Sequence, residues 1–411
     1  MSEAQIKPAL PMEIAPGLLG SALDKMLHAA YQCGASDISI QSNDYVVFMI
    51  SGRQVRASTR IIQQFEAESI TNALYGPNGV SMITQGHPID ERHEIHPARG
   101  ERVGFRIHIL PARIDGNDAG ISVTMRVLPK NPPNIESLLV PEEIVLNALP
   151  KNGLVTISGV TSSGKSTLLA ALLRYAYELK ADSDVTACGR KIATYEAPIE
   201  YVYDGIETLA PKISQTEVGA SAQGVESWGV AVSTAMRRAL QIILIGECRD
   251  PKTMDGCIEA ALTGHATLTT LHSGSVGESF RRMVSLSAEI GGGNEAVTEK
   301  LLGSVRLMIV QALVPKVGGG RVAFREWLPV TRSLKEKLFD VPHALIAKEM
   351  QKEVVARGTS LGHSALYAYR RNEVTLADAC AYSGLTRPEL MALELDESVF
   401  RPFTEGVRHA D

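Results

Sequence analysis

The sequence has little of what marks secreted or membrane-spanning proteins. Its five cysteines are odd in number and show no C-x-x-C spacing, so we expect a reduced, cytoplasmic chain without a disulfide framework. The start, Met1 to Lys7, lacks the charged and apolar regions of a signal peptide. No stretch reaches the roughly 20 apolar residues of a membrane span. Any attachment to a membrane is therefore expected to be peripheral and to come through partners.

Aromatic residues and positive charge are also scarce. Aromatics make up 5% of the chain, and 41 basic residues face 46 acidic ones. No basic stretch with interleaved aromatics is present, so nothing indicates direct nucleic-acid binding, and a helicase or DNA pump is disfavoured. His93 and His96 lie three residues apart in a predicted loop without further ligands, which argues against a metal site there.

The length of 411 residues predicts two or three domains. Residues 1–16 contain prolines and are expected to be loose. Residues 17–128 mix helical spacing with alternating strands, which indicates an α+β domain. Three prolines between 129 and 133 predict an extended linker, which we place at 129–140.

The second half alternates strands and helices. We expect an α/β domain over 141–334 with a mainly parallel sheet, followed by a helical region over 335–411. The predicted strands cover 154–158, 191–195, 241–246, 266–271 and 307–313, and a short strand at 322–324 follows a glycine turn.

The segment Gly159 to Thr167 fits the phosphate-binding pattern G-x-x-x-x-G-K-[ST] between a predicted strand and a predicted helix. Backbone N–H groups of such a loop point at phosphates. Lys165 is expected to reach the β- and γ-phosphates of ATP, and Ser166 to hold Mg²⁺. The expected nucleotide-binding residues are Gly159, Thr161, Ser162, Ser163, Gly164, Lys165, Ser166 and Thr167.

Two acidic positions follow predicted strands. Glu200 ends the segment Tyr-Glu-Ala-Pro-Ile-Glu and is our candidate for activating water. Glu247 comes after four aliphatic residues, where an open α/β sheet binds ligands, and is expected to hold Mg²⁺, directly or through water, or to polarise the attacking water. Exposed glutamates and a polar strand end are the alternatives.

Two histidines bracket the predicted strand 266–271. His265 and His272 would be roughly 20 Å apart along an extended strand, so they cannot share one metal or proton transfer within the chain. His272, at the carboxyl end of the strand, is better placed to sense the γ-phosphate.

The order of these motifs resembles the PilT-like secretion and pilus-motor ATPases over roughly three hundred residues, from about Ala35 to Lys316. Ala197 in the acidic segment, where retraction motors usually carry Asp, resembles the DotB branch of type IVB secretion and its TraJ-type conjugative relatives. The Ala-Leu-Thr-Gly-His and Thr-Thr-Leu-His segments resemble the same branch.

The resemblance implies an amino-terminal PAS-like α+β domain, a RecA-like ATPase domain and a homo-hexameric ring that works with inner-membrane secretion or conjugation proteins. It also implies that Glu200 and Glu247 are catalytic and that arginines of the amino-terminal domain contact the phosphates. The best matches for those arginines are Arg106 and Arg113. Solvated strand residues are the alternative for both.

Three positions depart from the family pattern. Ser162 and Ser233 replace a usual Gly and Arg, and Ala239-Leu240-Gln241 replaces a usual Asp-Pro-Asp turn. Serine fits position 162 if its backbone angles are ordinary, and is strained if φ is positive. Three functions stay open: a motor for type IVB secretion or conjugative DNA transfer, a type IV pilus retraction motor, and a nucleotide-gated binding module with little hydrolysis.

Overall fold

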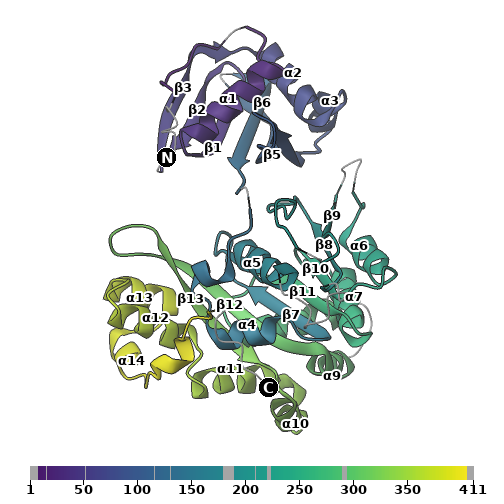
Figure 1. Cartoon of the computed structure of the whole chain (residues 1–411), viewed down its shortest axis with the longest axis vertical. Coiled ribbons are helices and arrows are strands. Elements are labelled where there is room, and N and C mark those ends of the chain that lie inside the picture. The colour runs from purple at the N-terminus through teal and green to yellow at the C-terminus, as the bar shows by residue number, and fades with distance from the viewer. Residues whose placement is uncertain are drawn as a thin grey trace. The chain divides into compact units, whose positions relative to one another are not determined.

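The structure is a computed structural model of the chain, and it describes residues 8–14, 16–50, 52–114, 116–129, 131–178, 189–208, 210–219, 224–288 and 294–404. Its contacts form two units (Figure 1). The first unit is Met1–Asn131 together with Ala197–Val202, and the second is Pro132–Glu196 and Tyr203–Asp411. The short segment Ala197–Val202 is therefore separated in sequence from the unit to which its contacts assign it.

The first unit is a six-stranded antiparallel sheet against which three helices pack. Strand order is β3-β2-β1-β6-β5-β4. Alternating buried residues such as Ile38, Ile40, Phe105 and Ile107 form its core. The elements are α1 (Ser21–Gln32), β1 (Ala35–Gln41), β2 (Asp44–Ile50), β3 (Arg53–Ile62), α2 (Gln64–Tyr75), α3 (Gly79–Thr84), β4 (Ile89–Ile95), β5 (Val103–Ile114) and β6 (Asn117–Val127).

The loop predicted around His93 is wrong, because residues 89–95 form β4, which pairs with β5. The strand is fully buried only at its two terminal isoleucines, so its polar middle carries no alternating pattern. Within the described residues, no group of three His, Cys, Asp or Glu side chains could hold a metal ion.

The second unit is built on a seven-stranded sheet of order β13-β12-β7-β11-β10-β8-β9. Every neighbouring pair is parallel except β12 with β13, which confirms the mainly parallel α/β sheet expected from the sequence. The strands are β7 (Gly153–Ser158), β8 (Ile192–Glu196), β9 (Ser214–Glu217), β10 (Ile242–Ile245), β11 (Ala266–Leu271), β12 (Val305–Pro315) and β13 (Arg321–Pro329).

Helices cover both faces of this sheet. The side chains on both sides of its strands are buried as a result. Ile242 and Leu244 of β10 lie in one core and Ile243 and Ile245 in the other. The first face packs on η1 (Ile135–Leu138), α4 (Glu142–Ala148) and α5 (Lys165–Glu178). The second packs on α6 (Trp228–Ala235), α7 (Pro251–Leu262), α8 (Val276–Ala288), α9 (Asn294–Ser304), α10 (Arg332–Phe339) and α11 (His343–Ala356).

The carboxy-terminal region is helical, as predicted. After α11 come α12 (Leu361–Arg370), α13 (Leu376–Ser383), α14 (Arg387–Met391) and η2 (Glu397–Phe400). Part of this region packs on the end of the β12–β13 hairpin, whose turn uses three glycines with positive φ, Gly318, Gly319 and Gly320. None of the helices in the described part of the chain is long and apolar enough to span a bilayer. Cys33, Cys248, Cys257 and Cys380 are free thiols, and Cys188 lies outside the described residues.

Candidate active site

The phosphate-binding segment connects the end of β7 to the start of α5, as the motif predicts. Gly159 has a φ of 146°, and a side chain there would collide with the carbonyl oxygen of Gln311. Gly164 has a φ of 82°, and a Cβ would lie 2.8 Å from the Gln311 side-chain nitrogen. Both motif glycines are thus required by close contact with β12 as well as by their backbone angles.

Lys165, the first residue of α5, is buried inside the loop. Its Nζ donates to the carbonyl oxygens of Gly159 at 2.7 Å and Val160 at 2.9 Å. The ammonium group is therefore held within the same loop whose backbone would surround a phosphate. Ser166 and Thr161 are exposed, and Thr167 is half-buried.

Ser162 adopts a positive φ of 64°, so its backbone is strained. A residue with a Cβ in this left-handed region costs about 1–2 kcal/mol relative to ordinary backbone. The next residue, Ser163, has a buried hydroxyl with no hydrogen-bond partner among the described residues. Strain and an unsatisfied buried hydroxyl therefore occur side by side in the segment that would contact phosphates.

The loop rests on a buried polar chain that the sequence analysis missed. Gln311 of β12 donates to the Ser163 carbonyl at 2.8 Å, and accepts from Arg325 of β13 at 2.8 Å. The Arg325 guanidinium also donates to the carbonyls of Leu139 and Leu138. Nothing local marks these residues, because a polar side chain within a strand does not show which distant group it will contact.

Arg325 carries a buried charge. It is 5% exposed, it forms no ion pair within the described residues, and burial lowers its pKa to about 10. Neutral oxygens therefore satisfy this cation, which lies one side chain away from the phosphate-binding loop. The arrangement adds positive potential beneath the loop.

Glu247 and His272 meet at the carboxyl ends of adjacent parallel strands. Glu247 follows β10, His272 follows β11, and His272 Nε2 lies 3.1 Å from Glu247 Oε1. Arg249 Nε lies 2.5 Å from the same oxygen. Burial raises the pKa of Glu247, but the hydrogen bonds and charges of Arg249 and His272 outweigh it and hold that pKa below its ordinary value. The carboxylate is thus kept ionised.

A chain of buried serine hydroxyls joins the carboxyl ends of β7 and β11. Ser279 of α8 donates to Ser158, the residue before the loop, at 2.9 Å. Its hydroxyl also lies 2.6 Å from that of Ser273, the residue after His272. The ends of β7 and β11 are therefore tied through one helix, a link that serine spacing in the sequence does not indicate.

Glu200 belongs to the segment assigned to the first unit. Its Oε1 lies 3.8 Å from Arg106 Nη1, and Arg92 Nη1 donates to the carbonyl of Ile199 at 2.7 Å. A Cβ at position 104 would lie 2.6 Å from the Arg92 guanidinium, so Gly104 leaves room for this arginine where it lies. Arg106 also forms two hydrogen bonds with Asp90, at 3.1 and 2.8 Å. Within the first unit, the structure thus brings Glu200 and Arg106 together.

Arg113 lies apart from that pair. It is 74% exposed and faces Asp118 at 3.4 Å.

The other two departures from the family pattern are also visible. Ser233 lies in α6 and bonds to its own helix at the Val230 carbonyl, and Ala239 has a φ of 48°. His265 lies before β11 with its Nδ1 3.1 Å from the Ala260 carbonyl oxygen, so the two histidines do bracket the strand.

A cavity of about 530 Å³ opens beside the phosphate-binding loop within the second unit. Gly164, Thr167 and Leu168 form its loop side, and Leu313, Tyr367 and Arg371 are among the residues opposite. Its size and mixed lining suit a small molecule.

Comparison with known proteins agrees with this architecture. The family described as "Type II/IV secretion system protein" matches residues 16–370. The type IV pilus ATPase PilU of Pseudomonas aeruginosa is 30% identical over 368 residues, which are 88% of each chain. The X-ray structure of the Legionella pneumophila ATPase DotB superposes with a TM-score of 0.76 at 34% identity, covering 91% of this chain and 97% of DotB.

A further solved structure, the pilus retraction motor PilT with bound ADP, has a TM-score of 0.72 at 24% identity and covers 88% of this chain and 96% of PilT. It supports the fold alone. The family match over most of the chain, the PilU identity and the ordered motifs agree with one another. The chain therefore belongs to the type II/IV secretion system protein family, and it is an ATPase of the secretion and pilus-motor kind.

Proposed function

We propose that this chain is a cytoplasmic, homo-hexameric ATPase that converts ATP hydrolysis into domain motion and energises a type IVB secretion or conjugative DNA-transfer apparatus. The observation that carries the proposal is the division of the candidate catalytic groups. The phosphate-binding loop, Glu247 and His272 lie in the second unit, whereas Glu200 and Arg106 lie in the first. Turnover would require both units, so hydrolysis would be coupled to their relative motion.

The second unit would bind the triphosphate. Backbone N–H groups of the loop and the start of α5 would receive the phosphates, and Lys165 would exchange its carbonyl partners for phosphate oxygens. The exposed Ser166 hydroxyl and the ionised Glu247 offer the oxygen ligands that Mg²⁺ prefers, so Ser166 and Glu247 would hold the ion, the latter directly or through water. When bound, Mg²⁺ would neutralise charge on the phosphates. His272 would keep the Glu247 carboxylate oriented.

The cavity beside Gly164 and Thr167 would receive the base and ribose, since it begins where the loop turns into α5. The buried hydroxyl of Ser163, unsatisfied within the described residues, fits a loop that completes its hydrogen bonds with a ligand.

The first unit would complete the reaction. Glu200 would accept a proton from the attacking water or orient it, and Arg106 would stabilise charge on the γ-phosphate after exchanging Asp90 for it. Arg113 is a second candidate for that contact, because its side chain is largely exposed. We propose residues 17–128 and 141–334 as the two moving bodies and 129–140 as their linker. Inner-membrane components of the transfer apparatus would be the partners.

Phosphate release tests the assigned roles. Glu200→Gln should retain ATP binding and lose turnover by at least 100-fold, whereas Lys165→Ala should lose both. Glu207→Gln serves as the matched control. It makes the same chemical change at a glutamate just after the segment that carries Glu200. Wild-type turnover in Glu200→Gln would remove that residue from its role, and negligible turnover by the unaltered protein would favour the binding module instead.

A second candidate function is a type IV pilus retraction motor. The 30% identity to PilU over 88% of both chains favours it. Deletion of the gene, complemented by wild type or by Glu200→Gln, separates the two. Loss of substrate secretion or plasmid transfer with normal pilus retraction supports the transfer apparatus, and the opposite result supports the retraction motor.

A further inference from the structure

A second cavity, of about 570 Å³, lies in the second unit at the amino-terminal ends of the parallel strands, opposite the ends that carry the phosphate-binding loop. Arg306, at the start of β12, helps to line it, and the Arg306 stem fills the space beside Gly153, the first residue of β7. The phosphate-binding loop follows the last residue of that six-residue strand. At about 3.3 Å per residue, the two sites are about 20 Å apart. This cavity is therefore separate from the proposed nucleotide site.

Every ionisable side chain that lines this second cavity is basic. They are Arg306, Arg332 and Lys335. Arg306 Nη1 and Lys335 Nζ each donate to the same carbonyl oxygen, that of Gly303, at 2.8 Å. Neither has a carboxylate partner in the part of the chain that the structure describes. Arg332 is paired with Glu336 at 2.9 Å on the exposed rim. Two cations thus converge on one neutral oxygen.

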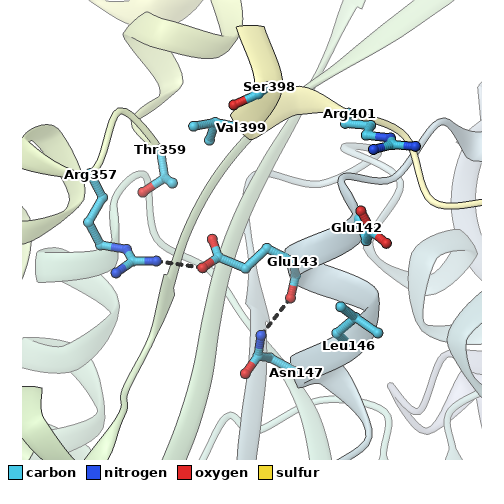
Figure 2. Close-up of a pocket in the computed structure, with 9 residues that line it drawn as sticks. All are labelled: Glu142, Glu143, Leu146, Asn147, Arg357, Thr359, Ser398, Val399 and Arg401. Atoms are coloured by element: carbon cyan, nitrogen blue, oxygen red, sulfur yellow. Dashed lines mark hydrogen bonds and ion pairs between the residues drawn. The ribbon is translucent and has the colours of Figure 1, made fainter. Parts of the chain in front are cut away.

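The neighbouring cavity provides an internal comparison. It holds about 370 Å³, it also lies along α4, and it shares Leu146 and Asn147 with the basic cavity. The arginine of that cavity has a carboxylate partner. Figure 2 shows Arg357 directed at Glu143, and the Arg357 Nη2 and Glu143 Oε1 atoms are 2.5 Å apart. Trp327 Nε1 donates to the other oxygen of Glu143 at 2.7 Å. Among the described residues, the arginine of one cavity has a carboxylate partner, whereas Arg306 and Lys335 of the other have none.

Two like charges held close together raise the free energy of the site until an anion arrives. Burial, and then the charge of Arg306, lower the pKa of Lys335 to about 8. The end of α9 offsets part of this cost through the Gly303 carbonyl. The start of α10, capped by Thr331, adds N–H groups at the same cavity. Leu146, Pro150 and Val330 form an apolar wall beside these charges.

We propose that this basic cavity binds the phosphate group of a phosphorylated compound, at a site independent of the ATP-hydrolysing one. Arg306 and Lys335 would bind the phosphate oxygens, and the apolar wall would contact the rest of the compound. The volume matches that of pockets which enclose small ligands. The same phosphate chemistry could come from a soluble compound or from a phospholipid headgroup, and the experiment below distinguishes them.

The test uses the full chain with Lys165→Ala, which removes the phosphate-binding lysine of the ATP site. Pyrophosphate is titrated by calorimetry. We expect one binding site in this background, at least tenfold weaker binding after adding Lys335→Gln, and unchanged binding after adding Lys337→Gln. Lys337 is the matched control, because it lies on the same helix and pairs with Glu353 at 2.9 Å outside the cavity. A glutamine at 335 can still donate to Gly303. Absence of binding in the Lys165→Ala chain, or equal binding in the two double variants, would overturn the proposal.

A second measurement does not depend on that substitution. Lysines are labelled by reductive ¹³C-methylation, and the pKa of Lys335 is followed by NMR. Saturating pyrophosphate should raise it from about 8 toward the ordinary value near 10.5 and leave that of Lys337 unchanged. An unmoved Lys335 would contradict the site even if the calorimetric variants misfold.

The source of the phosphate is decided with phosphatidylcholine vesicles that contain phosphatidic acid. Vesicle binding that needs Lys335 and is displaced by pyrophosphate assigns a phospholipid headgroup. Pyrophosphate binding without vesicle binding assigns a soluble phosphorylated compound. Both results support the phosphate site itself.

Discussion

Ser162 strains the backbone of the phosphate-binding loop, because it carries a Cβ at a positive φ. Its hydroxymethyl group is exposed, so packing does not compensate for a φ of 64°. We expect Ser162→Gly to be more stable than Ser162→Ala by about 1 kcal/mol, since only glycine adopts this conformation freely. Urea unfolding of the two variants measures the difference. Alanine is the proper reference, because it keeps the Cβ and removes only the hydroxyl. Equal midpoints would mean that the strain is relieved elsewhere.

Glu247 should govern the acidic side of the pH–activity profile. Its pKa is held below the ordinary value, so the carboxylate ionises at lower pH than a free glutamate and protonates only as the pH falls further. His272→Ala removes one of the two groups that lower this pKa. The acidic limb of kcat/KM should therefore move to higher pH.

His265→Ala is the control for that profile, because His265 lies at the other end of β11 with its Nδ1 near the Ala260 carbonyl. Its acidic limb should coincide with that of the wild type. A limb that does not move in His272→Ala would show that Arg249 alone sets the ionisation of Glu247.

Local pattern was enough to single out three of the candidate site residues. Lys165, Glu247 and His272 were predicted from their places beside strands, because the carboxyl ends of parallel strands meet at one edge. Gln311 and Arg325 were not predicted, since a polar side chain in a strand gives no sign of its partner 148 residues away in the loop. The φ of Ser162 also depends on surroundings that the local sequence does not encode.

At the scale of elements, β12 supports the phosphate-binding loop through one side chain. Gln311→Glu should keep the fold, because the new carboxylate faces the Arg325 guanidinium. It should weaken ADP binding by at least tenfold, since the donor to the Ser163 carbonyl is lost and a negative charge lies beneath the phosphates. Calorimetry with ADP measures this loss.

Gln311→Met separates the two causes, because it removes the hydrogen bond without adding charge. It should bind ADP more tightly than Gln311→Glu. Identical affinities for these two variants would mean that charge beneath the loop has no influence, contrary to our reading of Arg325.

Helix α2 should make the first unit acid-sensitive. Glu66 forms a capping box with Gln63, accepts from Gly17 N and pairs with Arg60 at 2.7 Å. The hydrogen bond from Arg60 is the main reason that its pKa falls to about 2. Because the folded-state pKa is lowered, this stabilisation is present above about pH 4.5 and is lost as the pH falls toward 2.

Glu66→Gln should therefore lose about 2–3 kcal/mol near neutral pH and approach the wild type in acid. Circular dichroism during urea unfolding from pH 7 to pH 3 tests this. Glu68→Gln, on the same helix, should follow the wild type throughout. A constant difference between Glu66→Gln and wild type across this range would rule out ionisation as the source.

The strands with continuous buried runs were predicted well. The predicted strands 154–158 and 266–271 agree with β7 and β11 almost to the residue. The polar strands β4 and β9 were missed, because half-buried side chains on both sides leave no alternation to detect. Tertiary pairing, with β5 and β8 respectively, makes them strands.

At the scale of the whole molecule, Arg92 should affect turnover through the segment that carries Glu200. Arg92→Gln loses the hydrogen bond to Ile199, so we expect normal ADP binding and at least tenfold slower ATP hydrolysis. Arg102→Gln is the control, because Arg102 is half exposed and 3.8 Å from Glu94. Equal effects of the two substitutions on phosphate release would assign Arg92 a general structural role.

The proposed ring predicts a particle six times the 44.3 kDa mass of one chain. Native mass spectrometry with and without a non-hydrolysable ATP analogue should detect it in at least one condition. A strict monomer in both would count against the motor. Sequence alone led to the ring only through family resemblance, since no composition or spacing encodes six-fold symmetry.

The assignment of Ala197–Val202 to the first unit has a consequence for how such proteins can be rebuilt. The chain passes between the units after Asn131, after Glu196 and after Val202. A chimaera joined once, near Pro132, would take its first unit from one parent and the Glu200 segment from the other. Homologous recombination faces the same constraint. Exchanges that keep function should therefore carry residues 197–202 along with the amino-terminal half, and coevolution should be sought between that short segment and β4 and β5.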